Sequence, residues 1–550
     1  GLDGLPAGVV EPRAFTQLPG AVVTVAGGLA EARNLAANPR VYSVAAADDD
    51  PQVRDEQSAQ IVAMGTEQAL APGYKDFLAR IGADGTGVVV HHVDTGADLN
   101  HPDLSGRAHV CMGYGAVGQN QCQATGGNDV GGHGTHTLGI ILGSGTTAFS
   151  DSGGFRYGQG MAPGATAVAQ NAIGSGSNAF SGGYRGPYQA ASRLGAIVSG
   201  NSWGPAGTPR GYDANTRTFD SMVRDADEET EGDQAMALVF SIMNGSGGTS
   251  TQGTPDEGKN IIGVGGTGSR GRGVDDLCTC TAHGPALDGR MLPDLVAPGQ
   301  GVISTRSTVG ASCAAPSTSA VPPSPLHSTC TGTSMASPHV TGGTAVFAEW
   351  YRDHFEGATP SPALVKAAFV NGADDLVGNL NANGGRMTNI PNNQQGWGRF
   401  NLGNVMDAWM AGTVHLDQTV VFDQPGQSHA VTVEPLDPSR PLKVSLAWTD
   451  ALGHGLGGSL PAWVNDLDLR VTGADGTAWL GNVFSAGRSV PGGEHDRRNN
   501  VENVFIDEPG AGAFSVSVTA ANLLGDGLPH REGVTDQDFA LVITNARPAG

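Results

Sequence analysis

Short apolar segments of strand length alternate with segments of helical pattern through the middle of this chain. Residues 88–93 form a β-branched run after a glycine-rich turn, and residues 196–199 and 237–241 are further apolar runs of strand length. Residues 136–142 and 334–350 have the apolar spacing of helices. Strands that alternate with helices predict an α/β fold in which a parallel sheet is flanked by helices.

The pattern changes near residues 410–415. Beyond that point several short segments alternate apolar and polar residues, and Gly, Asp, Asn or Pro separates them: 430–433, 442–448, 467–471, 514–518 and 539–543. Such segments predict an all-β sandwich. We therefore expect an α/β domain over residues 51–411 and a β-sandwich over 412–550. Residues 1–50 form a small α+β unit, with strand-like residues 15–25, helix-like residues 29–37 and strand-like residues 41–44.

The charge of the chain excludes several classes of protein. Its 550 residues carry a formal net charge of −23, which argues against binding nucleic acid or an anionic lipid surface. No uninterrupted apolar stretch reaches the length of about 18 residues that predicts a transmembrane helix. We expect a monomer that binds neither nucleic acid nor a membrane.

The cysteines indicate an oxidising compartment. They are six in number and lie in glycine- and serine-rich segments, which favours disulfide bonds and a secreted, extracellular protein. Their pairing stays open, although short spacing favours Cys111–Cys122 and Cys313–Cys330. The remaining pair, in Cys278-Thr-Cys280, lacks the C-x-x-C spacing that zinc sites prefer.

Three separate motifs carry residues that can act together. Val-Asp94-Thr-Gly ends a strand, Gly-Gly-His133-Gly-Thr-His begins a helix, and Gly-Thr-Ser334-Met-Ala-Ser-Pro begins another helix. A serine hydroxyl needs a base to remove its proton, and that base needs a carboxylate to orient it. Each motif alone is common in turns, strand ends and helix caps. Together, in the order Asp, His, Ser, they predict a catalytic triad.

These motifs resemble those of the subtilase family of serine proteases. The resemblance covers residues 60–410 and includes residues 93–104, 132–136 and 332–339, with weaker matches at 160–163 and 292–299. It implies a parallel-sheet α/β fold and a secreted serine endopeptidase that hydrolyses polypeptides through an acyl-enzyme on Ser334. His133 would then be the base and Asp94 its orienting carboxylate.

The resemblance also implies an oxyanion donor and a substrate-binding strand. Asn244 aligns with the family's oxyanion asparagine, and Ile242-Met243 stands where the family usually has Ala-Gly. Ser202-Trp203-Gly204 aligns with the strand that pairs with the substrate backbone. Core packing is the alternative role for Trp203. The bulk of Ile242 and Met243 puts the width of the substrate pocket in question.

No cofactor is required for this chemistry, but a structural calcium ion is a candidate. Residues 143–160 lack the asparagine cluster of the family's calcium loop, so that site is not carried over and Asp103 is expected to be a turn residue. The C-terminal segment resembles the jelly-roll domain of alkaline subtilisin-like proteases. Its Asp450, Asp466 and Asp468 are either calcium ligands or solvated turn and edge residues.

Residues 1–50 resemble the end of a subtilase propeptide, which implies a zymogen inhibited by its own N-terminal segment. Two other functions compete with the protease. Gly200-Asn-Ser202-Trp-Gly204 matches the G-x-S-x-G motif of an α/β-hydrolase esterase, although no helix-like segment follows it. A catalytically inactive surface or adhesion protein, binding through its β-sandwich, is the second alternative.

Overall fold

The computed structural model describes the chain in segments. These are the backbone of residues 9–14 and 21–25, and residues 56–64, 70–112, 122–123, 129–147, 149–151, 153–173, 180, 183–205, 209–270, 272–310, 312–313, 316–317, 324–531 and 533–549, without the side chains of 109–112, 122–123 and 316–317. The chain divides into two units, Gly1–Pro51 and Gln52–Gly550. In the first unit, β1 (Val9–Ala14) and β2 (Ala21–Val25) form an antiparallel pair. The predicted helix at 29–37 and strand at 41–44 lie outside the described residues.

An eight-stranded sheet organises the first part of the second unit. Its strands from edge to edge are β10 (Leu295–Gln300), β9 (Ile262–Gly268), β8 (Ala237–Ser241), β7 (Ala196–Asn201), β3 (Val89–Asp94), β6 (Thr166–Asn171), β4 (Ala108–Met112) and β5 (Cys122–Gln123). All neighbours pair in parallel except β4 and β5. The predicted α/β fold with a parallel sheet is therefore confirmed.

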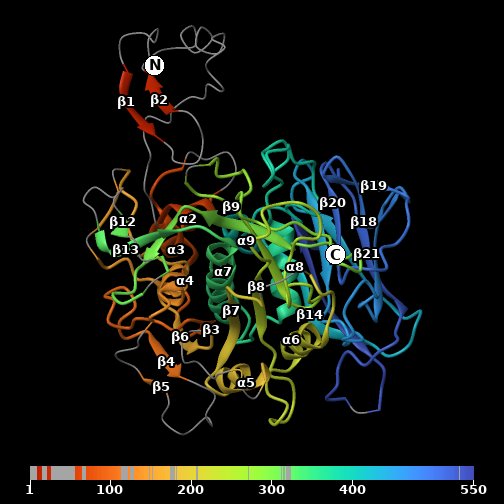
Figure 1. The fold of residues 1–550 in the computed structure, drawn as a ribbon. Coiled ribbons are helices and arrows are strands. Elements are labelled where there is room, and N and C mark those ends of the chain that lie inside the picture. The colour runs from red at the N-terminus through yellow and green to blue at the C-terminus, as the bar shows by residue number, and fades with distance from the viewer. Residues whose placement is uncertain are drawn as a thin grey trace. The chain divides into compact units, whose positions relative to one another are not determined.

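Helices cover both faces of this sheet (Figure 1). One face packs against α4 (His133–Leu142) and α7 (Thr333–His354), and the other against α5 (Arg185–Arg193) and α6 (Ala214–Arg224). Because side chains alternate along a strand, both faces can be apolar. In β3, Val90 belongs to the core on the α7 side and Val93 to the core on the α5 side. The shorter helices α2 (Glu56–Ile61), α3 (Tyr74–Ile81) and α9 (Leu402–Ala411) complete the α7 layer.

Two antiparallel sheets follow residue 413. One has the order β14 (Val414–Phe422), β22 (Gln537–Thr544), β16 (Leu442–Ala447) and β20 (Val501–Ile506); the other has β19 (Arg488–Pro491), β18 (Ala478–Ser485), β17 (Asp466–Gly473), β21 (Phe514–Asn522), β15 (Ser428–Pro435) and β23 (Ala546–Pro548). Their inner faces enclose one apolar core, to which Leu446, Leu469 and Val518 belong. This is the arrangement of a β-sandwich.

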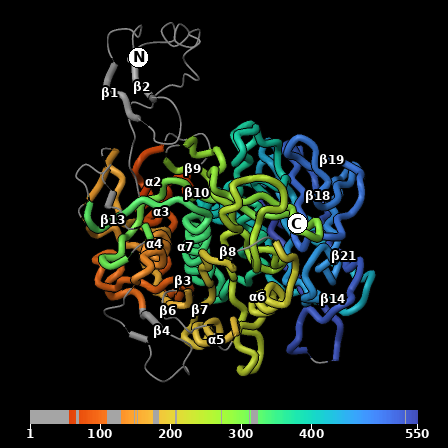
Figure 2. The backbone as a smooth tube through the Cα atoms, viewed as in Figure 1, coloured from red at the N-terminus to blue at the C-terminus, as the bar shows by residue number. Residues whose placement is uncertain are grey.

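Helix α8 (Pro362–Gly372) packs against strands β16 and β22 of the sandwich, and every residue of this helix is buried. The outer face of the β16 and β22 sheet supplies Ala447, Ala540 and Val542 to the same apolar core as α7 and α8. Arg224 of α6 pairs with Asp538 of β22 at 2.6 Å, and Figure 2 shows the blue C-terminal segment beside α6. The core is thus continuous from the parallel sheet to the sandwich.

The cysteines confirm part of the predicted pairing. Cys313 and Cys330 form a disulfide, and Cys278 and Cys280 form another across one intervening residue. The backbones of Cys111 and Cys122 lie opposite each other in the β4–β5 pair, and their side chains lie outside the described residues. Within the part of the chain described, no helix is both long and apolar enough to span a membrane.

Candidate active site

The three predicted triad residues lie at the end of one strand and at the starts of two helices. These ends meet beside the carboxyl ends of the strands of the parallel sheet. Asp94 is the last residue of β3, His133 is the first residue of α4, and Ser334 follows the first residue of α7. In an open α/β sheet the carboxyl ends of the strands form the crevice that binds ligands. The structure therefore brings residues 94, 133 and 334 of the sequence together, as the motifs predict.

A short contact joins Asp94 to His133. Nδ1 of His133 lies 2.8 Å from Oδ1 and 3.0 Å from Oδ2 of Asp94, whose side chain is fully buried. Thr95 N donates to Asp94 Oδ1 at 2.7 Å, and Thr137 Oγ1 donates to Oδ2 at 3.2 Å. A carboxylate at Nδ1 fixes the proton there, so the neutral ring presents Nε2 as the base.

The charges of the two residues stabilise each other. Burial would raise the pKa of Asp94, but the charge and hydrogen bond of His133 outweigh it and lower that pKa. Burial would lower the pKa of His133, but Asp94, helped by Asp129, raises it above its ordinary value. The imidazolium that forms when His133 accepts a proton is therefore stabilised.

This arrangement predicts the acid limb of the pH profile. His133 must be neutral to act as a base, so kcat/KM should fall as pH falls through its pKa, which lies above that of an ordinary histidine. Replacing Asp129 by Asn should move that limb to lower pH, because Asp129 is one of the charges that raise the pKa. The measurement is the pH dependence of kcat/KM for one peptide in both proteins. An acid limb that stays in place in D129N would contradict the electrostatic assignment.

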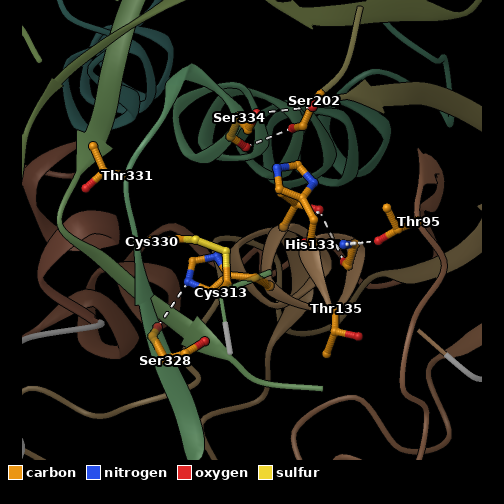
Figure 3. The surroundings of a disulfide bond; sticks show 12 residues. Thr95, His133, Thr135, Ser202, Cys313, Ser328, Cys330, Thr331 and Ser334 are labelled. Atoms are coloured by element: carbon orange, nitrogen blue, oxygen red, sulfur yellow. Dashed lines mark hydrogen bonds between the residues drawn. A yellow bond between two sulfur atoms is a disulfide. The ribbon is translucent and has the colours of Figure 1, made fainter. Parts of the chain in front are cut away.

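Ser334 lies beside His133 at the start of α7. Its Oγ donates to Ser202 O at 3.1 Å, while Ser202 Oγ donates to Ser334 O at 2.8 Å. Figure 3 shows the His133 ring directed toward Ser334 and Ser202. The first N–H groups of α7, including that of Ser334, have no partner within the helix and favour negative charge nearby.

Asn244 lies next to the same helix start, with its side-chain amide oriented by hydrogen bonds. Thr333 N donates to Asn244 Oδ1 at 2.8 Å, and Thr333 Oγ1 donates to it at 3.1 Å. Because Oδ1 accepts both bonds, the exposed Nδ2 group keeps its hydrogens for another acceptor. Gly332 leaves room here, since a Cβ at that position would lie 3.3 Å from Nδ2.

The two residues before Asn244 take different roles. Ile242 is fully buried in a small apolar cluster with Ala282 and Leu292, so it supports the segment from within. Met243 is half-buried and has a φ of 85°, a left-handed conformation that is uncommon for residues other than glycine. Backbone strain of this kind is concentrated at functional sites, and here it directly precedes the candidate oxyanion donor.

The predicted substrate strand begins where β7 ends. Ser202 holds the first turn of α7 through Ser334 O and through Ser337 Oγ at 3.0 Å. Trp203 is 9% exposed and packs against Phe219 and Phe240, so its side chain belongs to the core. Only the backbone of residues 202–204 is then left to pair with a substrate.

Asp129 is a residue of this site that the motif comparison missed. It is fully buried and accepts hydrogen bonds from Thr95 Oγ1, Gly132 N, Thr135 N and Thr135 Oγ1, all at 2.7 Å. These bonds connect the end of β3 to the first turn of α4, and so hold Asp94 and His133 in register. An acidic residue just before a helix start is the sequence signal that could have found it.

Asp103 is more than the turn residue that the sequence predicted. Its fully buried carboxylate accepts from Thr146 N at 2.7 Å, from Thr147 N at 3.1 Å and from His327 Nε2 at 3.1 Å. Burial would raise the pKa of Asp103, but the His327 bond and the backbone bonds lower it to about 2. Protein donors thus hold the loop after α4, where the family's calcium loop would lie.

The three candidate calcium ligands lie in different surroundings. Asp450 is buried and accepts from Lys259 Nζ at 2.5 Å and from Val464 N and Asn465 N, so an ammonium group already occupies the position of a cation. Asp466 and Asp468 share the polar face of β17, and mainly burial, with Asp468 adding, raises the pKa of Asp466 to about 6. His495 Nδ1 lies 3.2 Å from Asp468 Oδ1. Calcium binding at Asp466 and Asp468 stays a prediction.

Comparison with known proteins finds sequences that are similar to this chain. The model of the subtilase family matches residues 85–398. The serine protease/ABC transporter B family protein tagA of Dictyostelium discoideum is 27% identical over 281 residues, which are 47% of this chain and 15% of that protein. Subtilisin-like protease 1 of Arthroderma gypseum is 28% identical over 49% of this chain and 45% of its own length.

Two further matches are also serine proteinases by name. The thermophilic serine proteinase of Bacillus sp. (strain AK1) is 27% identical over 52% of this chain and 57% of its own length. The crystal structure of a cold-adapted subtilisin-like serine proteinase aligns with 57% of this chain and 91% of that chain, at 20% identity and a TM-score of 0.39. The chain spans less than two thirds of tagA and of the Arthroderma and Bacillus proteins.

The family model covers more than half of the chain, and its range contains Asp94, His133, Asn244 and Ser334. The chain belongs to the subtilase family.

Proposed function

We propose that this chain is a secreted serine endopeptidase that hydrolyses peptide bonds through an acyl-enzyme on Ser334. The observation that carries the proposal is the contact of His133 Nδ1 with buried Asp94 at 2.8 Å, with Ser334 beside the opposite edge of the ring. A nucleophile, a base and an orienting carboxylate are the groups that such a mechanism requires.

The steps follow from these positions. Ser334 Oγ attacks the substrate carbonyl while His133 Nε2 takes its proton, and Asp94 stabilises the resulting imidazolium. Asn244 Nδ2 and the N–H of Ser334 donate to the oxygen that becomes negative. His133 then returns the proton to the leaving amine, and water repeats the sequence on the acyl-enzyme.

Covalent labelling tests the assignment of the nucleophile. A fluorophosphonate should modify Ser334, and mass spectrometry of the digested protein should locate the adduct there. Labelling at Ser202 would support an esterase instead, but Ser202 Oγ is hydrogen-bonded to Ser334 O and Ser337 Oγ of α7, and the next helix among the described residues, α6, begins only at Ala214. Failure of the native protein to react would favour an inactive binding protein.

Asn244 provides a second test with a defined magnitude. Asn244→Ala should lower kcat by roughly 10²–10³ with a small change in KM, the range known for loss of this donor in subtilisin. Thr333→Val removes one of the two bonds that orient the amide and should cause a smaller loss. Equal kcat in N244A and the parent would remove Asn244 from the mechanism.

The proposal has three further parts: secretion, inhibition by a propeptide and the monomeric state. Secretion is supported by the two disulfides, because such bonds persist in oxidising compartments. We also propose that residues 1–50 are a propeptide that inhibits the enzyme, and that the processed enzyme is a monomer. Purified active protein whose N-terminus is still Gly1 would count against processing.

A further inference from the structure

A buried carboxylate lies behind the residues that should bind the substrate. Asp256 is 2% exposed, and its Oδ2 accepts from Gly253 N at 2.9 Å. Its Oδ1 has no hydrogen-bond partner in the described part of the chain. A buried acceptor without a partner lowers stability, and more so when it is charged, so this atom calls for an explanation.

Asp256 lies close to the two segments that are proposed to bind the substrate, 202–204 and 242–244. A Cβ placed on Gly204 would lie 3.8 Å from Asp256 Oδ1 and 2.9 Å from Thr254 O. A Cβ placed on Gly253 would lie 3.0 Å from Asp256 Oδ2 and 3.5 Å from Cε of Met243. The carboxylate therefore lies between the end of segment 202–204 and the residue that precedes Asn244.

A substrate bound at Ser334 would lie next to both segments. Ser334 and Asn244 mark the position of the attacked carbonyl, and Ser202 O is 3.1 Å from Ser334 Oγ. The residue that carries this carbonyl must therefore place its side chain beside segments 202–204 and 242–244. Met243 belongs to the second segment, and the thioether of a methionine can adapt its conformation to a long aliphatic stem.

Other buried oxygen atoms close to Asp256 in the sequence also lack a hydrogen-bond partner in the described part of the chain. Gln252 Oε1 and Thr254 Oγ1 are also buried and without a partner among the described residues. Neighbouring Glu257 is already satisfied, since Gln252 Nε2 and Leu287 N donate to it. A group that only donates hydrogen bonds, such as guanidinium or ammonium, matches this set of oxygens.

We propose that Asp256 selects substrates with arginine or lysine at the residue whose carbonyl is attacked, by pairing its carboxylate with the side-chain cation. The inference rests on the proposed endopeptidase function and names its substrate class. A larger residue at 204 or 253 would crowd Thr254 O or the Asp256 carboxylate. Met243 contacts the stem of the bound side chain.

A peptide series that differs only at this residue tests the proposal. The purified chain should cleave the Arg and Lys peptides at least about tenfold faster in kcat/KM than the norleucine and Gln peptides. Asp256→Asn should lower kcat/KM for Arg and Lys by roughly 10- to 100-fold, the range for loss of a hydrogen bond to a charged group. The norleucine value should stay within a few-fold, which also shows that the variant is folded.

Glu257→Gln is the matched control, since it removes a neighbouring buried acid whose bonds are already made. At a pH well above 8, where Asp256 is ionised in both proteins, it should leave the ratio of Arg to norleucine peptides unchanged. An unchanged ratio in D256N would overturn the proposal, as would a preference of the native protein for norleucine or Gln. If no peptide is cleaved and Ser334 does not react with a fluorophosphonate, the proposed function itself is wrong.

Binding and pH provide readouts that a merely structural role would not change. Benzamidine, which mimics an arginine side chain, should bind the Ser334→Ala protein and should lose roughly 10- to 100-fold in affinity when D256N is added. Burial, with Glu257 adding to it, raises the pKa of Asp256 to about 8. The ratio of Arg to norleucine peptides should therefore increase as pH rises through that value, and should stay level in D256N.

Discussion

Replacing Ser334 by alanine should lower kcat by roughly 10⁶, the loss that removal of the nucleophile causes in subtilisin. The hydroxyl is the only triad atom that forms a bond with the substrate, and KM should change little because the binding segments remain. A residual rate above that of water should persist, since Asn244 and the helix start still stabilise the oxyanion. The measurement is kcat for a peptide substrate, with circular dichroism as the check on folding.

The triad should behave as one unit. Asp94→Asn alone should cost about 10⁴ in kcat, because an amide at His133 Nδ1 favours the wrong tautomer. Added to Ser334→Ala it should cost almost nothing further, since the base has no hydroxyl left to act on. A double variant that loses the product of the two effects would show that Asp94 acts apart from Ser334.

Ser328→Ala is the matched control for this series. Ser328 lies near the site in Figure 3, is fully buried, and has a hydroxyl without a partner in the described part of the chain. Its backbone O accepts from His136 Nε2 at 3.1 Å, and alanine keeps that bond. Activity should therefore remain close to that of the parent, and a large loss would show that substitution alone disturbs the site.

The sequence predicted features that depend on neighbouring residues. It missed features that depend on contacts between distant segments. Asp94 was predictable because the β-branched run before it and the glycine after it are local signals for a strand end. Asn244 was assigned through the resemblance of its segment, although Ile242 and Met243 depart from the family pattern. The orientation of its amide depends on Thr333, 89 residues away. The same holds for Asp256, since Gly204 and Met243 approach it from separate segments.

In the C-terminal segment, too, the sequence predicted the local structure but not the contacts between distant segments. Alternation of apolar and polar residues predicted β-strands there, because that period is a property of each strand. In a sandwich the polar residues of such strands usually face solvent, whereas β22 is buried along its whole length because α8 covers its outer side. Asp450 looked like a calcium ligand since its ion-pair partner, Lys259, is 191 residues distant.

Lys259→Met should lower the free energy of unfolding by about 3–5 kcal/mol, the cost of leaving one charge of a buried ion pair unpaired. Both side chains are 1% exposed, so water cannot take the place of the ammonium. Asp450 would keep its bonds from Val464 N and Asn465 N but would lose the opposite charge. The measurement is urea unfolding of variants built on Ser334→Ala, which prevents self-digestion.

Two controls separate the buried charge from lost packing. Arg488→Met breaks the pair with Asp507, whose side chains are 56% and 49% exposed, and should cost no more than about 1 kcal/mol. Adding Asp450→Asn to Lys259→Met should restore most of the lost stability, because the remaining groups are neutral and asparagine can still accept the two amide bonds. If the double variant is as unstable as K259M, the loss comes from the packing of the lysine stem. If K259M itself costs less than about 1 kcal/mol, the ion pair does not hold the sandwich to the parallel sheet, and the apolar contacts of α8 carry that interface.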